Sequence, residues 1–422
     1  MIQAWARAVE AAQASAPLLG RMVQELGAIG GGSDGSVSRL AFTQDERDAH
    51  ALIGAWLEAA GWVVRCDPFG NTIADRPGAR DLPALAFGSH ADSVPLGGRF
   101  DGAAGVVLAV RLAQILAESD VATEHPIRIV VFAAEEGARF GEPCLGSKAI
   151  CGLLNSEDAD RLRDGDGITL GSAMTSLGFD PAEASATQWA DDEIALFIEP
   201  HIEQGRILES TRSEVGVVDA VTGSARMRLT LTGRSDHSGG TPMALRRDAL
   251  AAAAEVITLV ERLGRRYPRG TAATVGRLTV RPNSLTTVPG EVELFLDIRD
   301  VDELRRQESV RLVTEAVEQI SSARGIAAEL ELIAHTIPAH LWSWGRQLLR
   351  DACDASGTRW RVLTSGAGHD AQIIARRFPA AMLFVPSKDG ASHVPWEWTE
   401  PQQLAVGLDV LVRAVERADQ IN

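Results

Sequence analysis

The chain has 422 residues, of which 45% are hydrophobic and 23% charged, a composition typical of a soluble globular protein. Its length predicts two or three domains. The formal net charge of -16 argues against nucleic acid or an anionic membrane as a partner, because both attract basic patches. An acidic substrate stays open, since a single arginine can bind a carboxylate within an acidic protein.

The cysteines and the N-terminal sequence favour the cytoplasm. The four cysteines are scattered without a CxxC pair, which favours free thiols in a reducing compartment. Arg7, Glu10, Arg21 and Glu25 interrupt the apolar pattern of the N-terminus, which therefore indicates an amphipathic helix rather than a signal peptide. No apolar run is long enough to cross a bilayer.

The first part of the chain alternates helical and strand patterns. We expect helices over residues 3–26, 44–60 and 103–117, and strands over 62–66, 72–74, 85–87 and 127–133. Strands that alternate with helices predict an α/β fold, and long apolar strands are typical of a sheet covered on both faces. Residues 151–193 are rich in Asp, Ser and Gly and are interpreted as an insertion, after which a strand at 194–198 resumes the sheet.

The pattern changes at about residue 213. Strands of period two and two long helices follow in the order ββαββαβ, over residues 215–221, 225–232, 243–263, 271–280, 291–298, 301–322 and 327–334. We therefore expect a mixed-sheet α/β domain formed by residues 1–211 and 332–422. Residues 212–331 are expected to form an inserted, ferredoxin-like α+β domain with a four-stranded antiparallel sheet and two helices on one face.

Histidines and carboxylates follow three of the apolar strands. His90 and Asp92 lie two residues apart at a strand end, so their side chains face the same way at the sheet edge where α/β proteins bind ligands. Glu135 and Glu136 follow the strand at 127–133, and His201 ends another strand. Each motif alone has a structural alternative: an ordinary core histidine, or a glutamate at a solvated strand end.

Two loop residues complete a candidate metal site. Asp101 precedes a helix, where a helix cap is the alternative, and His393 lies in a loop after a strand at 381–385. Histidine and carboxylate ligands suit zinc, with manganese or cobalt as substitutes. Two cations that share a carboxylate can lower the pKa of a bound water and polarise a carbonyl group, while a neighbouring glutamate transfers the proton.

Several blocks in a fixed order resemble the metal-dependent M20 peptidase superfamily, and more closely its hydantoinase/carbamoylase branch. These blocks are GSHADSVPLGGRFDGAAGV, EEGARF, GSKAICG, EPHIEQG, DHSGGTPM, RPNSLTTVPG, LDIRD, SGAGHDAQ and VPSKDGASH. The resemblance implies hydrolysis of N-carbamoyl-L-amino acids to amino acid, CO2 and NH3. Alternatives are allantoate or another N-acyl or amide-conjugated amino acid as substrate, or a non-catalytic relative, which would lack a ligand or the base.

The resemblance also implies roles for the motif residues. It implies two divalent metal ions per chain, one held by His90 and His201, the other by Glu136 and His393, with Asp101 bridging them. Asp92 would orient His90, and Glu135 would be the general base.

The substrate-binding roles come from the same resemblance. His237 would stabilise the oxyanion, and Arg299 would grip a substrate carboxylate that backbone amides near Gly366 and Ala367 approach; the full set implied is Gln204, His237, Asn283, Arg299, Gly366 and Ala367. Without the resemblance, His237 is a loop histidine, Asn283 a turn former and Arg299 a surface arginine. The inserted domain would act as a lid and hold a homodimer together.

Overall fold

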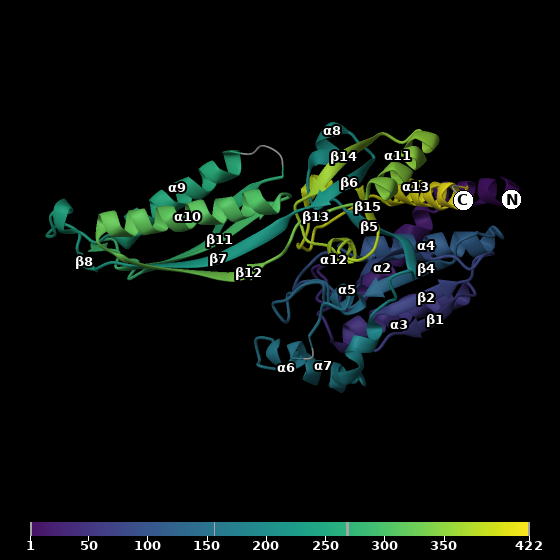
Figure 1. The fold of residues 1–422 in the computed structure, drawn as a ribbon, viewed down its shortest axis with the longest axis horizontal. Coiled ribbons are helices and arrows are strands. Elements are labelled where there is room, and N and C mark those ends of the chain that lie inside the picture. The colour runs from purple at the N-terminus through teal and green to yellow at the C-terminus, as the bar shows by residue number, and fades with distance from the viewer. Residues whose placement is uncertain (1, 156, 267–269, 421–422) are drawn as a thin grey trace. The chain divides into compact units, whose positions relative to one another are not determined.

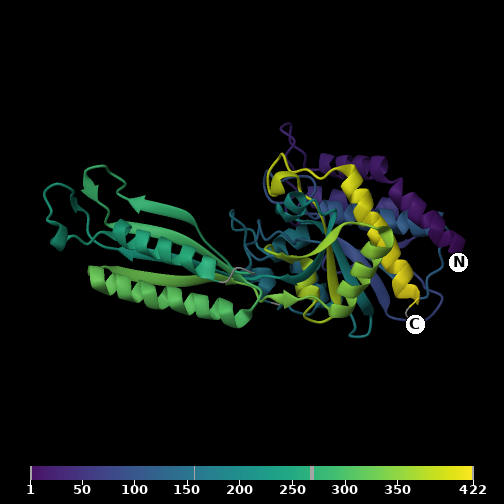
Figure 2. The ribbon, with the colours of Figure 1, turned by 90° about the horizontal axis from the view of Figure 1, so that it is seen from above.

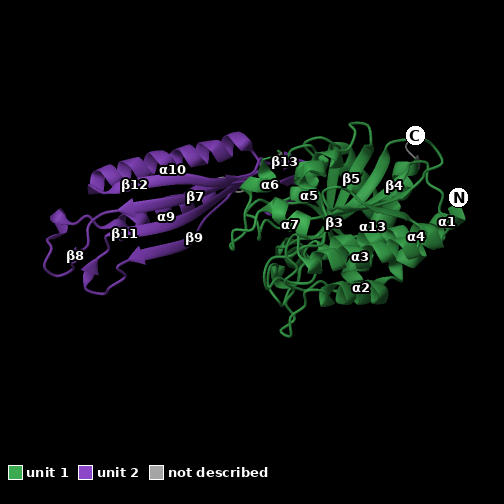
Figure 3. Cartoon of the chain, turned by 90° about the horizontal axis from the view of Figure 1, so that it is seen from below, with its two compact units in different colours: residues 1–219, 341–363, 369–422 green, residues 220–340, 364–368 purple. Residues whose placement is uncertain are grey.

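The computed structural model describes residues 2–155, 157–266 and 270–420 (Figure 1). The chain forms two compact units, which Figure 3 colours separately. Unit 1 comprises Met1–Asp219, Leu341–Leu363 and His369–Asn422, and unit 2 comprises Ala220–His340 and Thr364–Gly368. Among the helices of the described ranges, none is both long and apolar enough to span a membrane.

Unit 1 begins with α1 (Ile2–Gln13), α2 (Ala16–Ala28) and α3 (Gln44–Ala59). The prediction of one continuous helix over residues 3–26 is wrong. The chain breaks around Ser15, because Pro17 lies in the first turn of α2 and has no N–H to continue the hydrogen-bonding of α1.

A mixed sheet whose strands belong mostly to unit 1 confirms the mixed α/β fold. The strand order is β1-β2-β4-β3-β5-β15-β6-β13, with β14 paired to β6. The strands β4, β3, β5 and β15 are parallel neighbours, whereas β1, β2, β6 and β13 join antiparallel. Their bounds are β1 (Val63–Cys66), β2 (Thr72–Arg76), β3 (Ala84–His90), β4 (Ile127–Phe132), β5 (Ile194–Ile202), β6 (Val215–Val221), β13 (Ala339–His340), β14 (Trp360–Ser365) and β15 (Ala380–Val385).

Long helices bury the sheet of unit 1. The helix α4 (Ala103–Glu118) contacts β3 and β5, and nearly all of its side chains are buried, because α2 and α13 (Pro401–Gln420) cover its other faces. Figure 2 shows α13 beside the N-terminal helix α1. The remaining helices are α5 (Leu145–Ile150), α6 (Asp158–Arg161), α7 (Leu170–Ser176), η1 (Pro181–Thr187), α8 (Ile207–Thr211), α11 (Ser343–Ser356), α12 (Asp370–Ile374) and η3 (Lys388–Gly390).

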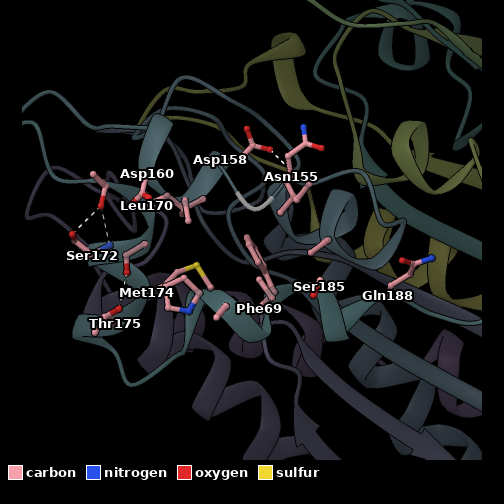
Figure 4. Close-up of a pocket in the computed structure, with 18 of the residues that line it drawn as sticks. Phe69, Asn155, Asp158, Asp160, Leu170, Ser172, Met174, Thr175, Ser185 and Gln188 are labelled. Carbon is pink, nitrogen blue, oxygen red and sulfur yellow. Dashed lines mark hydrogen bonds between the residues drawn. The ribbon is translucent and has the colours of Figure 1, made fainter.

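The segment interpreted as an insertion carries α6, α7 and η1 and lines a cavity of about 850 Å³ (Figure 4). Phe69, Leu170 and Met174 give this cavity buried apolar walls. Polar side chains around it bond locally, as Thr169 does with Ser172. Of the described residues that line the cavity, none belongs to the predicted site.

Unit 2 has a four-stranded antiparallel sheet with the order β12-β7-β11-β9. One face packs against α9 and α10 through an apolar core that includes Leu229, Leu294 and Val256. The elements are β7 (Gly223–Thr232), β8 (Asp236–His237), η2 (Met243–Leu245), α9 (Ala249–Arg266), β9 (Ala272–Arg281), β10 (Thr287–Val288), β11 (Glu291–Asp300), α10 (Glu303–Arg324) and β12 (Ala327–His335).

Two expectations about this region are corrected. The strand Val215–Val221 lies in the large sheet, where Val217 pairs with Leu383, and the boundary between the units falls within this strand, at Ala220. Its residues are buried on both faces, which the sequence pattern of period two does not indicate. The helix expected over 243–263 begins at Ala249, because Asp248 Oδ1 accepts hydrogen bonds from two backbone N–H groups of its first turn.

Candidate metal centre and active site

The candidate ligands meet where four parallel strands end. The carboxyl ends of β4, β3, β5 and β15 lie at one edge of the sheet, because these strands are parallel neighbours. His90 is the last residue of β3, and His201 is the penultimate residue of β5. Glu135 and Glu136 follow β4, and His393 lies in the loop after β15. All five belong to unit 1.

The structure arranges these side chains as two donor groups that share Asp101. His90, Asp101 and His201 form a buried group, in which Asp101 Oδ1 lies 3.2 Å from His201 Nε2 and 3.7 Å from His90 Nε2. Asp101, Glu136 and His393 form the second group, in which Asp101 Oδ2 lies 3.2 Å from His393 Nε2. Each carboxylate oxygen of Asp101 therefore faces a different group.

Backbone carbonyls fix the tautomers of the two buried histidines. His90 Nδ1 lies 3.1 Å from the carbonyl oxygen of Asp92, and His201 Nδ1 lies 2.9 Å from that of Ile202. A carbonyl oxygen only accepts, so each Nδ1 carries the proton. Each Nε2 faces Asp101 Oδ1, and the backbone N of Gly102 also points at His201 Nε2 at 3.2 Å. With Nδ1 bonded to a carbonyl oxygen and Nε2 directed into the cluster, both rings are oriented as in histidines that ligate a metal.

Asp92 joins the ends of β3 and β4. Its Oδ1 accepts from the backbone N of Glu135 at 2.9 Å, and its Oδ2 accepts from that of Glu136 at 3.0 Å. Its carboxylate lies 3.5 Å from His90 Nδ1, farther than its own carbonyl oxygen. Asp92 therefore orients His90 mainly through its backbone, and its carboxylate holds the Glu135–Glu136 turn.

Glu135 lies beside the donor groups without belonging to either. The residue is 6% exposed; its Oε2 lies 3.8 Å from His90 Nε2, and its Oε1 accepts from the thiol of Cys144 at 3.1 Å. Burial raises the pKa of Glu135 well above its usual value, and the carboxylates of Asp370 and Glu136 add to the rise. A raised pKa suits a group that accepts a proton and later returns it.

The electrostatics of the cluster fit bound cations. Burial raises the pKa of Glu136, and its Oε1 has no hydrogen-bond partner among the described residues, although it lies 3.3 Å from His393 Nε2. The carboxylates of Asp101 and Glu136 raise the pKa of His393 to about 11. Several carboxylates buried in one place are unfavourable unless positive charge pairs with them, so this donor set suits divalent metal ions.

The sequence interpretation missed Glu397 and Ser392. Glu397 is 2% exposed, and its Oε1 accepts from the backbone N of Phe100 at 2.7 Å and of Asp101 at 2.9 Å. Its Oε2 accepts from the N of His393 at 3.3 Å, so one carboxylate holds a ligand from each of two distant loops. Ser392 Oγ donates to Asp101 Oδ2 at 2.6 Å. The signal in the sequence that could have identified Glu397 is its position four residues after the candidate ligand His393.

Gln204, predicted to bind substrate, also touches the shared carboxylate. Its Nε2 donates to Asp101 Oδ2 at 2.7 Å and to Ser392 Oγ at 3.2 Å. The backbone of Gln204 has φ 56°, and that of His393 has φ 59°, which are uncommon for residues other than glycine. Such conformations cost of order 1–3 kcal/mol each and gather at functional sites, where surrounding structure enforces them.

Gly102, next to Asp101, is required by close packing. A Cβ at this position would lie 2.4 Å from the ring of His90, and φ is +62°. Both the space and the backbone conformation therefore demand glycine. The absent side chain lets the loop that carries Asp101 approach His90.

The remaining predicted residues lie in unit 2. His237 is exposed, and its Nδ1 accepts from the backbone N of Gly239 and of Gly240, each at 3.0 Å, so its Nε2 carries a proton that it can donate. Asn283 is exposed, with φ 56°. Arg299 is half-buried and bonds to Asp297 and to the carbonyl oxygen of Gly366.

The backbone amide of Ala367, expected near a substrate carboxylate, donates instead to Ser365 Oγ at 3.2 Å. Ser365 Oγ in turn donates to the carbonyl oxygen of Ala367 at 3.0 Å. This closed turn leaves the Gly366 carbonyl, rather than the Ala367 amide, as the group that meets Arg299.

Comparison with known proteins places this site in a family. Residues 86–417 match the model of peptidase family M20/M25/M40. The chain belongs to this family. It is a family of metal-dependent hydrolases, and the two donor groups that share Asp101 lie within the matched residues.

Individual relatives are similar along nearly their whole length. An N-carbamoyl-L-amino-acid amidohydrolase of Paenarthrobacter aurescens is 39% identical, with 97% of this chain and 99% of the relative covered. An allantoate amidohydrolase of Bacillus subtilis is 32% identical, with 92% and 94% covered. The crystal structure of a hydantoinase/carbamoylase family amidase from Burkholderia multivorans has a TM-score of 0.89 and 35% identity, with 95% of this chain and 97% of that chain covered.

Proposed function

We propose that the chain hydrolyses the carbamoyl group of N-carbamoyl-L-amino acids. The observation that carries this proposal is Asp101, whose two oxygens face two separate donor groups, with the buried carboxylate of Glu135 beside them. Such an arrangement suits attack of a water molecule on an amide carbonyl. The similarity to N-carbamoyl-L-amino-acid amidohydrolases over most of the chain supports the substrate class.

Two divalent ions per chain, with zinc as the proposed metal, fit the donors. His90 and His201 would hold one ion, Glu136 and His393 the other, and Asp101 would bridge them. When bound, such ions lower the pKa of a water molecule and polarise the substrate carbonyl. Nitrogen and carboxylate donors in this ratio suit zinc, and manganese or cobalt would fit the same set.

The chain's own residues would supply proton transfer and orientation. Glu135 accepts a proton from the attacking water and delivers it to the leaving nitrogen, for which its raised pKa is suited. The C–N bond to the amino acid breaks, and the carbamate that is released decomposes to CO2 and NH3. Asp92 would keep Glu135 in place, because its carboxylate accepts from the backbone N–H of Glu135.

Residues of unit 2 would bind and stabilise the substrate. His237 presents Nε2–H as a donor for the developing oxyanion, because its Nδ1 already accepts two backbone bonds. Arg299 would bind the substrate carboxylate, and Asn283 and the turn at Gly366, together with Gln204 of unit 1, would complete the binding set. Residues 212–331 would serve as a lid and as the contact of a homodimer. The four free cysteines support a reducing compartment such as the cytoplasm.

Allantoate is the second candidate substrate, favoured by the 32% identity to an allantoate amidohydrolase. Allantoate also carries a carboxylate and a ureido group, so the same donors and the same arginine would serve both reactions. Its central carbon carries a second ureido group in place of an amino-acid side chain, and direct comparison of the two substrates separates the candidates.

Release of ammonia from the ureido substrates, and of the free amino acid from the N-acetyl substrates, by purified, metal-loaded protein tests the proposal. The panel contains N-carbamoyl-L-amino acids, N-carbamoyl-β-alanine, allantoate and N-acetyl amino acids, and Glu135→Gln prepared identically is the control for contaminating activity. We expect the highest kcat/KM for an N-carbamoyl-L-amino acid. Preference for allantoate would support the second candidate, and inactivity on every ureido compound would overturn both.

A further inference from the structure

Arg299 lies on the face of the unit 2 sheet opposite the helices. Along β11, Val292, Leu294, Leu296 and Ile298 are buried in the core beneath α9 and α10. Residues two apart on a strand face the same way, so Asp297 and Arg299 share the opposite face. They line a cavity of about 640 Å³ together with Arg226, Arg277, Phe295, Ile333 and Gly366.

Asp297 and Gly366 hold the guanidinium of Arg299 from two sides. Arg299 Nε donates to Asp297 Oδ2 at 3.0 Å, and Nη2 donates to the same oxygen at 2.7 Å. Arg299 Nη1 donates to the carbonyl oxygen of Gly366 at 2.5 Å. A guanidinium has five N–H groups, so these three bonds, counted over the part of the chain that the structure describes, leave one on Nη1 and one on Nη2.

We propose that Asp297 is a positioning residue that fixes Arg299 so that its two remaining N–H groups bind the substrate carboxylate. This inference rests on the proposed function. The two remaining N–H groups lie on the two terminal nitrogens of one plane, and they match the two oxygens of a carboxylate when Gly366 accepts from the Nη1–H on the Cδ side. Without Asp297 the long side chain of Arg299 would have to be ordered by the substrate itself, and binding would weaken accordingly.

The charges around Asp297 agree with this role. The carboxylate of Asp297 balances the charge of Arg299, while Arg226 Nε lies 4.0 Å from Asp297 Oδ2 and Arg277 lies over the ring of Phe295. Three arginines and one aspartate therefore line the cavity, a net positive lining in a chain of net charge -16. This positive lining attracts an anionic substrate group. Because Asp297 occupies the Nε side of the Arg299 guanidinium, the anionic group meets the Nη1 and Nη2 side.

Substitutions at residue 297 test the inference with two substrates. The first is the preferred N-carbamoyl-L-amino acid, and the second is its amide, which lacks the carboxylate. Asp297→Ala should raise KM for the acid about 10–100-fold, the effect of losing a charge-assisted contact, with kcat changed much less. The kinetic constants for the amide should stay at the wild-type values.

Asp297→Asn should restore most of the affinity. Both bonds from Arg299 end on one oxygen of Asp297, and the amide oxygen of asparagine can accept both. Glu293→Ala, on the same strand and the same face, is the matched control and should behave as wild type. Circular dichroism and urea unfolding check that each variant folds.

Three results would overturn the inference: an unchanged KM for the acid in Asp297→Ala, equal losses on acid and amide, or no recovery in Asp297→Asn. An unchanged KM would show that Asp297 has no role in binding the acid. Equal losses on acid and amide would show that Asp297 supports the structure as a whole. No recovery in Asp297→Asn would show that its charge, rather than its position as a hydrogen-bond acceptor, matters. Failure of the proposed function is visible separately, because the wild-type protein would then hydrolyse no ureido acid.

Discussion

Replacing Glu397 tests how the loops that carry Asp101 and His393 are held. Alanine at this position removes the acceptor of the buried N–H groups of Phe100 and Asp101. Each buried donor left without a partner costs about 1–3 kcal/mol, so the two together cost about 2–6 kcal/mol. Glutamine keeps one oxygen that can accept both bonds and loses only the longer bond to the N of His393.

The charge of Glu397 must be separated from these hydrogen bonds. Burial, together with the charge of Asp101, raises the pKa of Glu397 to about 7 in the folded state. The folded protein therefore holds the proton more tightly than the unfolded chain between about pH 4.5 and 7, and the metal-free protein loses about 3 kcal/mol as the pH rises through this window. Glu397→Gln removes this loss and should be at least as stable as wild type at pH 8.

Urea unfolding of the metal-free proteins at pH 8 measures the difference. Glu397→Ala should unfold with a free energy about 2–6 kcal/mol below that of Glu397→Gln. Metal analysis of separately loaded samples should find less metal in the alanine variant, because Asp101 and His393 lose their common anchor. Equal stability and equal metal content in the two variants would refute the account of Glu397.

Two further outcomes are expected. His201→Ala and His393→Ala, which remove donors from different groups, should each lower the metal content from two ions to about one per chain; loss of both ions from either single variant would show one indivisible site. Burial, with a smaller contribution from Arg47, lowers the pKa of His50 to about 3 in the folded protein. Below about pH 6.5 the unfolded chain therefore binds a proton at His50 that the folded protein does not. The free energy of unfolding falls by about 1.4 kcal/mol per pH unit as a result. In urea unfolding between pH 7.5 and 5, the unfolding free energy of His50→Gln should lack this part of the pH dependence. An unchanged pH dependence would contradict the conclusion that His50 is buried and neutral.

The placement of the candidate ligands could be predicted because it follows from strand order. Apolar runs that end at His90, before Glu135 and at His201 predict buried parallel strands, and parallel neighbours bring their ends together. The structure places all five candidate ligands at that edge. The mixed α/β fold was predictable for the same reason, since the alternation of strands and helices is local information.

The missed features depend on contacts between distant segments. Glu397 follows no periodicity, and its role comes from backbone N–H groups almost three hundred residues earlier in the chain. The strand Val215–Val221 was predicted in the inserted domain, because only its pairing with β15 reveals that it belongs to the large sheet. The break at Ser15 was overlooked because the apolar stripe continues past Pro17.

The most direct test of the central claim is Glu135→Gln, with turnover and metal content measured on the same preparation. Glu135 lies outside both donor groups, so the variant should keep about two metal ions per chain. Hydrolysis of an N-carbamoyl-L-amino acid should fall by about 10²–10⁴-fold, the usual contribution of a general base. Turnover near the wild-type rate, or loss of metal from the variant, would contradict the assignment of Glu135 to proton transfer beside a two-metal centre.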